Sequence, residues 1–441
     1  MRYIPHTEED RREMLRTIGV KDIDDLFIDI PKKLRLSEPL DIPESLDEHK
    51  ILKSLHEIGS KNLNLLQVTS FLGAGVYEHY IPSIVMALIS RGEFLTSYTP
   101  YQAEASQGYL QTIYEFQSLI CEITGMDVTN ASMYDGGTAA AEAVLMASQI
   151  KNKSIILMER SLHPHYRQCI ETFARTSGSE VETFDLREWK HADNKNAACL
   201  VVQYPDFFGR ITDLSNARQL ANECNALLIV VAEPIALGLL EPPGNFGADI
   251  VVGELQPCGI PMGYGGPMAG YFCVRKEWIR SMPGRIVGKT HDKEGRRGFV
   301  MTLRTREQDI RREKATSNIC TNQALMALAA TIWLSALGKH GFRKIAETCV
   351  QKAHYLAKEL CKIPGVELQF PEIPFAFEFC LNIGRDGRIV RDKLLQKGYL
   401  AGLPLGDYYP DMQNCILIAV TEVRTKKEMD DFVSHFAEVL R

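Results

Sequence analysis

The chain has 441 residues, of which 45% are hydrophobic and 24% are charged, and its formal net charge is −6. The length predicts more than one compact core. The negative charge argues against nucleic-acid binding, because nucleic-acid-binding proteins need a basic surface to displace counterions from phosphates. No hydrophobic run approaches the ~20 residues of a membrane span, and the polar, acidic N-terminus is unlike a secretory signal. We therefore expect a cytoplasmic globular protein that does not enter a membrane.

The N-terminal residues 1–60 are expected to form a helical arm. Thr7 can cap a helix over residues 8–18, and Gly19 can end it. A second helix is predicted over residues 43–58. The stretch between them is punctuated by prolines, which favours an extended segment that lies on another surface.

Residues 61–335 are expected to form a large α/β domain, because short apolar runs alternate there with helical stretches. The apolar runs are residues 154–158, 198–203, 227–231, 250–252 and 271–274. The helices between the earlier runs are predicted at residues 138–150, 165–175 and 214–225. Continuous apolar strands that alternate with helices indicate a mainly parallel sheet covered on both faces.

Residues 336–441 are expected to form a smaller α+β domain. Long amphipathic helices over residues 322–337 and 342–361 lead into it. Its remaining predicted elements are strands near residues 377–383 and 415–420 and helices over residues 388–397 and 426–440.

Two glycine-rich turns, at residues 73–75 and 263–266, raise the possibility of dinucleotide binding. Neither completes Gly-x-Gly-x-x-Gly, because Glu78 and Met268 occupy the last positions. Ordinary turn glycines are the better interpretation.

Two histidines, His163 and His165, follow the apolar run at residues 154–158. No cysteine or carboxylate lies at zinc-ligand spacing from them, so we predict no metal site. The preceding run would place them at the carboxyl edge of the sheet, where α/β proteins build their sites. A site histidine without a metal and a structural histidine are both compatible with this pattern.

Three further segments combine polar groups that suit a binding site. Gly136, Gly137 and Thr138 open an alanine-rich helix whose N-terminus could hold a phosphate, although an ordinary capped helix has the same pattern. Residues 96–104 place tyrosine, glutamine and glutamate side chains around a proline turn, which suits a substrate loop or a structural corner. Residues 304–321 are rich in arginine, which suits an anion site or a self-paired charged surface.

Four stretches carry a resemblance to one family. They are TSYTPYQAEASQGYLQTIYEFQ, DGGTAAAEA, GADIVVGELQPCGIPMGYGGP and RTREQDIRREKATSNICTNQ. They resemble the N-terminal half of glycine decarboxylase, the P-protein of the glycine cleavage system. The similarity covers essentially the whole chain, whose length matches one subunit of the split, two-subunit form.

The resemblance implies a fold-type-I aminotransferase-like structure, with a mainly parallel seven-stranded sheet and an α+β C-terminal domain. It also implies an activity shared with a partner, the cofactor-bearing P-protein subunit, in a heterotetramer. That partner holds pyridoxal phosphate, glycine loses carbon dioxide, and the aminomethyl group passes to the lipoyl arm of the H-protein.

The cofactor-bearing half of the family has its lysine in a His-Lys-Thr-Phe-Cys-Ile-Pro stretch, and Gln256 takes the place of that lysine here. An amide nitrogen is not nucleophilic and cannot form the Schiff base. The nearest lysines, Lys276 and Lys289, lie beyond the following strand. Where the family pairs the pyridinium nitrogen with an aspartate, Glu233 is the only acid.

We therefore expect a degenerate site without a covalent cofactor. Its residues are Gly136, Gly137, Thr138, His163 and Gln256.

The resemblance further implies that loops of this chain reach the site of the partner. The candidates for shaping its glycine pocket are Tyr98, Tyr101 and Gln102. The candidates for touching its cofactor phosphate are Thr316, Ser317 and Asn318. Two alternatives stay open: a scaffolding subunit that stabilises the partner or docks the H-protein, and an independent dehydrogenase, which the incomplete dinucleotide motif disfavours.

Overall fold

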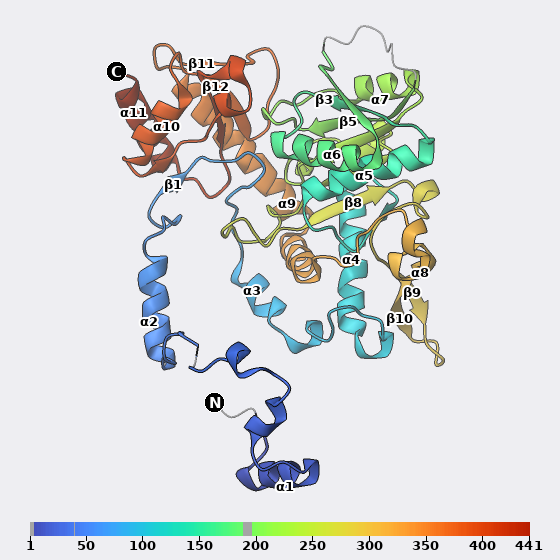
Figure 1. Cartoon of the computed structure of the whole chain (residues 1–441). Helices are drawn as coiled ribbons and strands as arrows, with labels where there is room; N and C mark the ends of the chain where they lie inside the picture. The colour runs from blue at the N-terminus through green and yellow to red at the C-terminus, as the bar shows by residue number, and fades with distance from the viewer. Residues whose placement is uncertain (1–3, 39, 188–195) are drawn as a thin grey trace. The chain divides into compact units, whose positions relative to one another are not determined.

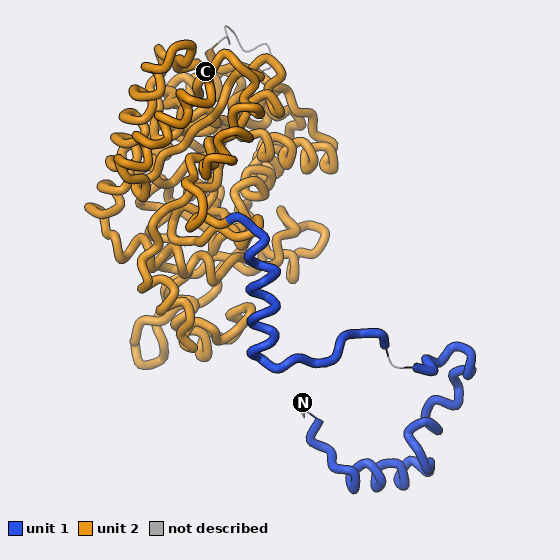
Figure 2. Tube along the Cα trace, turned by 90° about the vertical axis from the view of Figure 1, so that its left-hand side faces the viewer, with its two compact units in different colours: residues 1–63 blue, residues 64–441 orange. Residues whose placement is uncertain are grey.

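The computed structural model describes residues 4–38, 40–187 and 196–441, which fall into two compact units, residues 1–63 and residues 64–441 (Figure 2). The first unit contains α1 (Glu8–Ile18) and α2 (Glu48–Gly59). The predicted first helix is confirmed, because Thr7 and Asp10 form a reciprocal cap and Gly19 ends the helix with φ +91°. The second helix begins later than predicted, because the side chain of Asp47 accepts a hydrogen bond from the Lys50 amide and so sets its start.

The described residues of the unit formed by residues 1–63 build no hydrophobic core of their own. None of its described residues is buried. Ile28 and Leu36, for example, are 82% and 79% exposed. The proposal that this arm lies on another surface stays a prediction.

The second unit is built on a seven-stranded sheet in the order β2-β8-β7-β6-β5-β3-β4 (Figure 1). Its strands are β2 (Val128–Thr129), β3 (Ile155–Glu159), β4 (Glu180–Phe184), β5 (Ala197–Tyr204), β6 (Leu227–Ala232), β7 (Ile250–Glu254) and β8 (Gly270–Val274). Strands β7, β6, β5, β3 and β4 are parallel, and β8 runs antiparallel to both β7 and β2. The mainly parallel seven-stranded sheet is therefore confirmed.

Helices cover both faces of this sheet. They are α4 (Gln107–Thr124), α5 (Gly136–Lys151), α6 (Pro164–Ser177), α7 (Leu214–Glu223) and α9 (Ala324–Leu360). Along β6, Leu227 and Ile229 pack with α5 and α6, whereas Leu228 and Val230 pack with α4, α7 and α9. Successive side chains of a strand point to opposite faces, so a strand buried on both sides has to be apolar throughout.

The C-terminal part contains a four-stranded antiparallel sheet in the order β11-β12-β15-β14. These strands are β11 (Glu367–Leu368), β12 (Glu378–Asn382), β14 (Leu403–Pro404) and β15 (Cys415–Ala419), flanked by α10 (Gly387–Leu395) and α11 (Lys426–Leu440). Two helices were predicted in the region of α9, over residues 322–337 and 342–361, and the structure confirms them. They meet at a kink at Gly338, whose φ of +59° and ψ of −179° interrupt the helical geometry.

Several short elements were not predicted. They are α3 (Ser83–Ile89), α8 (Gln308–Arg311), the hairpin of β9 (Ile286–His291) and β10 (Arg297–Thr302), and the parallel pair of β1 (Thr69–Ser70) and β13 (Tyr399–Leu400). Among the described residues, no helix is long and apolar enough to cross a membrane.

Candidate functional site

The carboxyl ends of β5, β6 and β7 surround a small cavity of about 30 Å³. Its lining residues are Gly75, Tyr77, His163, Tyr166, Gln203, Val231, Ala232, Glu233, Pro234, Glu254 and Pro257. This is the sheet edge at which α/β proteins place their ligands. His163 is one of these lining residues. Gly136 and Gln256 lie next to the cavity, because Gly136 is hydrogen-bonded to Glu254 and Gln256 to Tyr77.

Gln256 is buried, with 2% of its surface exposed, and both ends of its amide are hydrogen-bonded. Its Oε1 accepts from the Tyr77 amide at 2.9 Å, and its Nε2 donates to the Tyr77 carbonyl at 2.9 Å and to the Ile260 carbonyl at 3.1 Å. The side chain therefore pairs with the backbone of residue 77 as a neighbouring strand would. The hydrogen bonds of its amide group therefore stabilise the local structure.

The start of α5 is also hydrogen-bonded to groups of this chain. The side chain of Asp135 accepts from the Thr138 amide at 2.7 Å, and the Thr138 hydroxyl accepts from the Asp135 amide at 3.3 Å. The Gly136 amide donates to Glu254 Oε2 at 2.9 Å. A Cβ built on Gly137 would lie 3.2 Å from Asp135 Oδ1, so this turn is tight as well. The predicted phosphate cradle is a capped helix N-terminus that already holds a carboxylate of this chain.

The sequence interpretation missed Glu254, which is central to the cavity. The signal available was an acid at the end of the apolar run Ile250–Glu254, two positions before Gln256. Burial raises the pKa of Glu254 to about 7, although hydrogen bonds from Gly136 and Ala269 oppose this shift.

His163 is buried at the N-terminus of α6, where its Nδ1 accepts a hydrogen bond from the His165 amide at 3.1 Å. Its Nε2 therefore carries the hydrogen and donates to the Ala74 carbonyl at 2.9 Å. Burial lowers the pKa of His163 to about 4. The Tyr166 ring stacks on the imidazole with centroids 4.8 Å apart. His163 is thus a neutral capping residue that also lines the cavity.

Two further carboxyl groups, those of the half-buried Glu233 and the buried Glu378, lie around the cavity. Burial raises the pKa of each to about 7. Glu233 accepts from the amides of Ile235 and Ala236, at 3.1 and 2.7 Å. Glu378 accepts from the Tyr77 hydroxyl at 2.8 Å.

These carboxyl groups predict that stability falls as pH rises above 6.5. A carboxyl group whose folded pKa lies near 7 holds its proton in the folded state, whereas the unfolded group releases it near 4.5. The folded state then binds more protons, so the free energy of unfolding decreases with rising pH. His163 acts in the opposite direction below pH 6.5, so urea unfolding between pH 6.5 and 8 isolates the carboxyl contribution.

Glu378→Gln should reduce this pH slope, because the amide oxygen can still accept from the Ala74 amide but the side chain no longer titrates. A free energy of unfolding that stays constant or rises over this pH range would contradict the prediction.

The residues proposed to reach the partner lie on the surface, and none lines the cavity described above. Tyr98 and Tyr101 are 78% and 56% exposed. Gln102 is exposed beside them. The Arg304 guanidinium lies 4.9 Å from the centre of the Tyr101 ring, and pairs with Asp309 at 2.7 Å.

The second loop follows α8 in the chain. The Thr316 carbonyl accepts from Gln149 at 3.3 Å, and the Ser317 hydroxyl accepts from the Ile319 amide at 3.0 Å. Asn318 Oδ1 accepts from Gln308 at 3.1 Å. Gln308 begins the helix that contains Asp309, so both loops border the segment at residues 304–311.

In the arginine-rich segment, one arginine pairs with a carboxylate of the same segment and another is buried. Arg304 has its carboxylate partner, whereas Arg306 is buried and donates to the Met282 carbonyl. Burial lowers the pKa of Arg306 to about 10.

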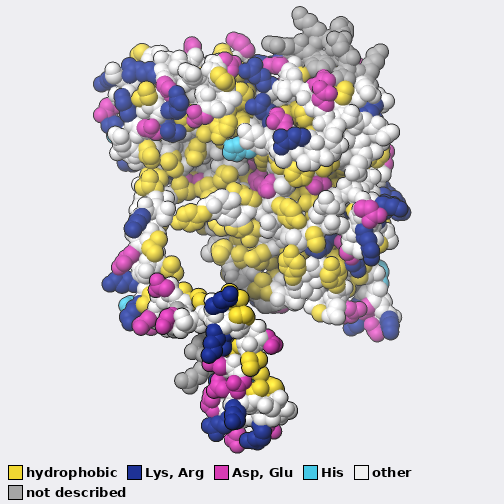
Figure 3. All heavy atoms as spheres, in the orientation of Figure 1, with side chains coloured by type: hydrophobic (Ala, Val, Ile, Leu, Met, Phe, Trp, Pro, Cys, Tyr) yellow, Lys and Arg dark blue, Asp and Glu magenta, His cyan; other side chains and the backbone are white. Residues whose placement is uncertain are grey.

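Exposed hydrophobic side chains lie close to the Tyr98 loop in the sequence. Tyr80, Met86 and Leu95 are 63%, 52% and 60% exposed. Tyr80 precedes α3 in the chain, Met86 lies in it and Leu95 follows it. Figure 3 shows hydrophobic side chains spread over the middle of this face of the protein. Exposed apolar area of this kind is typical of a surface that binds another protein.

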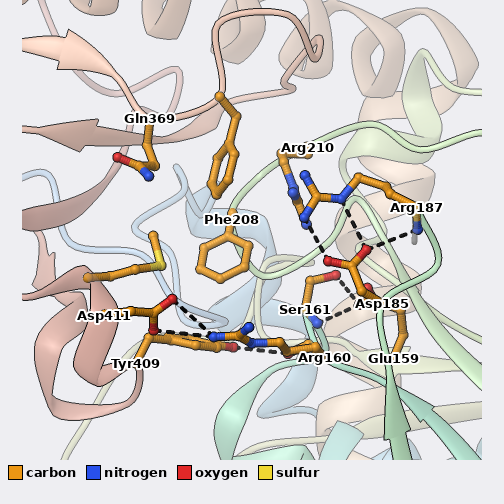
Figure 4. A pocket seen from close by; sticks show the side chains of 12 residues that line it. Glu159, Arg160, Ser161, Asp185, Arg187, Phe208, Arg210, Gln369, Tyr409 and Asp411 are labelled. Carbon is orange, nitrogen blue, oxygen red and sulfur yellow. Dashed lines mark hydrogen bonds and ion pairs between the residues drawn. The ribbon is translucent and has the colours of Figure 1, made fainter. Parts of the chain in front are cut away.

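A second cavity, of about 130 Å³, is bounded by residues after β3, β4 and β5 on one side and by residues of the C-terminal part on the other (Figure 4). We call it the arginine cavity, and its charged lining residues are Glu159, Arg160, Asp185, Arg187, Arg210 and Asp411. Ion pairs join Arg160 to Asp411 at 3.1 Å and Arg187 to Asp185 at 2.8 Å. The sequence interpretation did not identify this cavity, because its residues come from five separated segments.

One group of described residues has the composition of a metal site: His79, Cys349 and Glu422. The Glu422 carboxylate accepts from His79 Nδ1 at 2.7 Å and from the Cys349 thiol at 3.4 Å. These hydrogen bonds account for the cluster without an ion, and the absence of a metal site stays a prediction.

The sheet order, the covering helices and the position of the cavity define an aminotransferase-like fold of the pyridoxal-phosphate-dependent class. An alanine–glyoxylate aminotransferase from Nostoc sp. shares this fold, with a TM-score of 0.60 at 19% identity over 93% of this chain and 98% of that chain.

More specific matches follow from the sequence. The model of the glycine cleavage system P-protein family matches residues 1–436, and the chain belongs to that family. The probable glycine dehydrogenase (decarboxylating) subunit 1 of Anoxybacillus flavithermus is 50% identical over 444 residues, covering 99% of each chain. A crystal structure of glycine decarboxylase (P-protein) of the glycine cleavage system, in inhibitor-bound form, has a TM-score of 0.91 at 42% identity and covers 100% of both chains.

Proposed function

We propose that this chain is subunit 1 of a two-part glycine decarboxylase and acts in complex with a subunit that carries the cofactor. The support is its membership in the P-protein family, together with a full-length relative named as subunit 1. With that partner, in a heterotetramer in the cytoplasm, it decarboxylates glycine and transfers the aminomethyl group to the lipoyl arm of the H-protein. Pyridoxal phosphate held by the partner supplies the electron sink for the decarboxylation.

The hydrogen bonding of Gln256 supports the proposal that the partner subunit, and not this chain, holds the cofactor. Its amide cannot form a Schiff base, and both of its ends are already paired with the backbone. None of the residues that line the nearby cavity is a lysine, and the side chains of Tyr166 and Glu254 are part of its wall. The residues present in this chain therefore do not fit a covalently bound cofactor.

The contribution of this chain to catalysis is proposed to come from its surface loops. Tyr98, Tyr101 and Gln102 are exposed, and no described hydrogen bond engages either tyrosine hydroxyl. Exposed phenols on a loop can bind a small zwitterion such as glycine once a partner covers them. Thr316, Ser317 and Asn318 are proposed to lie against the cofactor phosphate of the partner.

A scaffolding role is the alternative. The exposed hydrophobic side chains around α3 favour stable association with a partner whether or not the loops take part in the chemistry. The two roles differ in their response to substitutions that leave the complex intact.

Reconstitution distinguishes these functions. We expect neither the isolated chain nor the isolated partner to catalyse glycine-dependent carbon dioxide exchange, and the mixture to do so. In the complex, Tyr98→Phe should lower the exchange rate about tenfold, because one hydrogen bond to a charged group contributes roughly 1.5 kcal/mol. Tyr264→Phe is the control, since Tyr264 is 93% exposed and belongs to neither loop.

Full activity of Tyr98→Phe, Tyr101→Phe and Asn318→Ala in intact complexes would favour the scaffolding role. An isolated chain that is active by itself would contradict the proposed function.

A further inference from the structure

The carboxylate of Glu254 gathers four backbone N–H groups at the carboxyl end of β7. Its Oε2 accepts from Gly136 at 2.9 Å. Its Oε1 accepts from Leu255, Gln256 and Ala269 at 3.0, 3.1 and 3.2 Å. Gly136 is the first residue of α5, so this carboxylate lies at the positive end of a sixteen-residue helix.

Backbone N–H groups that converge at a helix N-terminus are the usual receptor for a phosphate group. In this protein the receptor contains a carboxyl group that is part of the chain itself. The receptor is also closely packed: a Cβ built on Gly136 would lie 2.4 Å from the Tyr166 hydroxyl and 3.0 Å from the Glu254 amide.

The Tyr166 ring occupies the space between this receptor and His163. It stacks on the imidazole with an interplanar angle of 30°, and both residues line the cavity. An aromatic ring and a carboxylate of the chain thus fill a region in which a ring with an anionic arm would bind.

We propose that Glu254 is an internal replacement for an external phosphate monoester, and that it keeps this site closed independently of the missing lysine. The proposed function rests on Gln256 and on the partner, whereas this inference concerns the anion receptor of this chain alone. Restoring a lysine at position 256 would therefore not be sufficient to restore cofactor binding.

The first test uses the purified full-length chain and inorganic phosphate. Glu254→Ala should have a lower Tm than the wild-type chain, and phosphate should raise that Tm by several degrees in a saturable manner. Chloride at equal ionic strength should not do so. The Tm of the wild-type chain should rise only slightly and without saturation. Phosphate has this effect on any folded protein, because it is excluded from the protein surface.

Glu233→Ala is the matched control. Glu233 lines the same cavity and accepts from two backbone amides, but these belong to the turn at residues 235–236 and not to α5. Its removal should produce no saturable response to phosphate. Glu254→Gln covers the case in which the alanine variant does not fold, because its amide oxygen retains one acceptor and should leave a smaller response to phosphate.

Variants of Glu254 that phosphate stabilises no more than it stabilises the wild-type chain would overturn the proposal. So would variants that fold neither with nor without phosphate.

The second test uses Gln256→Lys, incubated with pyridoxal phosphate and reduced with borohydride. We expect mass spectrometry to find no pyridoxyl adduct on residue 256. An adduct there would show that the lysine alone had been missing, and the proposal would be wrong. Neither test requires the partner or glycine turnover, so its failure is distinct from failure of the proposed function.

Discussion

Replacing Asp206 by alanine should lower the free energy of unfolding by about 3–5 kcal/mol. Asp206 and Arg210 are each 3% exposed, and Arg210 Nε donates to Asp206 Oδ2 at 2.6 Å. The guanidinium lies over the rings of Phe208 and Phe370, at 5.1 and 4.4 Å from their centres. Without Asp206 this cation stays buried and loses its ion-pair partner. Urea unfolding at pH 7 measures the loss.

The other oxygen of Asp206 contributes as well. Its Oδ1 accepts from the amides of Phe208 and Arg210, both at 3.0 Å, and so holds the loop after β5 in its turn. Burial raises the pKa of Asp206 even though Arg210 opposes the shift. The expected loss therefore reflects an unpaired buried cation and unpaired amides, and not a strong net attraction within the pair.

Asp411→Ala is the control for this prediction. Asp411 pairs with Arg160 in the same arginine cavity, but the two side chains are 63% and 52% exposed. Its removal should cost less than about 1 kcal/mol, because solvent screens an exposed pair. Equal losses for the two variants would contradict the role assigned to burial.

Gly209→Ala should prevent the chain from folding, or destabilise it by more than about 4 kcal/mol. Gly209 has φ +80°, and an added Cβ would lie 1.8 Å from the Glu378 carbonyl oxygen. This close approach joins the loop after β5 to β12, because the Gly209 carbonyl also accepts from the Ala376 amide at 3.1 Å. Soluble yield, near-ultraviolet circular dichroism and Tm measure the effect.

Gly178→Ala separates the steric effect from the backbone effect. Gly178 ends α6 with φ +73°, but nothing lies within 4 Å of its added Cβ. The free energy of unfolding of the Gly178→Ala variant should be only about 1–2 kcal/mol lower, because alanine is strained in the left-handed conformation. A Gly209 variant that is no less stable than this control would disprove the steric argument.

The core of the fold could be predicted from the sequence where burial leaves a pattern. Strands such as β6 are apolar at every position, and α11 has the predicted bounds, residues 426–440. The hairpin of β9 and β10 could not be predicted in this way. β9 contains Lys289 and ends at His291, and β10 begins at Arg297. The burial of both strands is partial, so no continuous apolar pattern marks them.

The sequence predicted where in the fold the candidate site lies, but not which hydrogen bonds its residues form. The position of His163 after the apolar run at residues 154–158 predicted the carboxyl edge of the sheet, and the structure places His163 in the cavity there. The sequence could not show that Glu254 bonds to Gly136, because 118 positions separate them and the contact depends on how β7 lies beside α5. The roles of Tyr98 and of the loop at residues 316–318 stay predictions, because they concern a surface that another chain would complete.

The paired hydrogen bonds of Gln256 also bear on how the chain could have diverged. Lysine has three donors and no acceptor, so it could donate to the Tyr77 carbonyl but could not accept from the Tyr77 amide. Reversion to lysine would leave that buried N–H unpaired, at a cost of about 1–3 kcal/mol. The two hydrogen bonds of Gln256 therefore disfavour a lysine at this position through stability alone, before cofactor binding is considered.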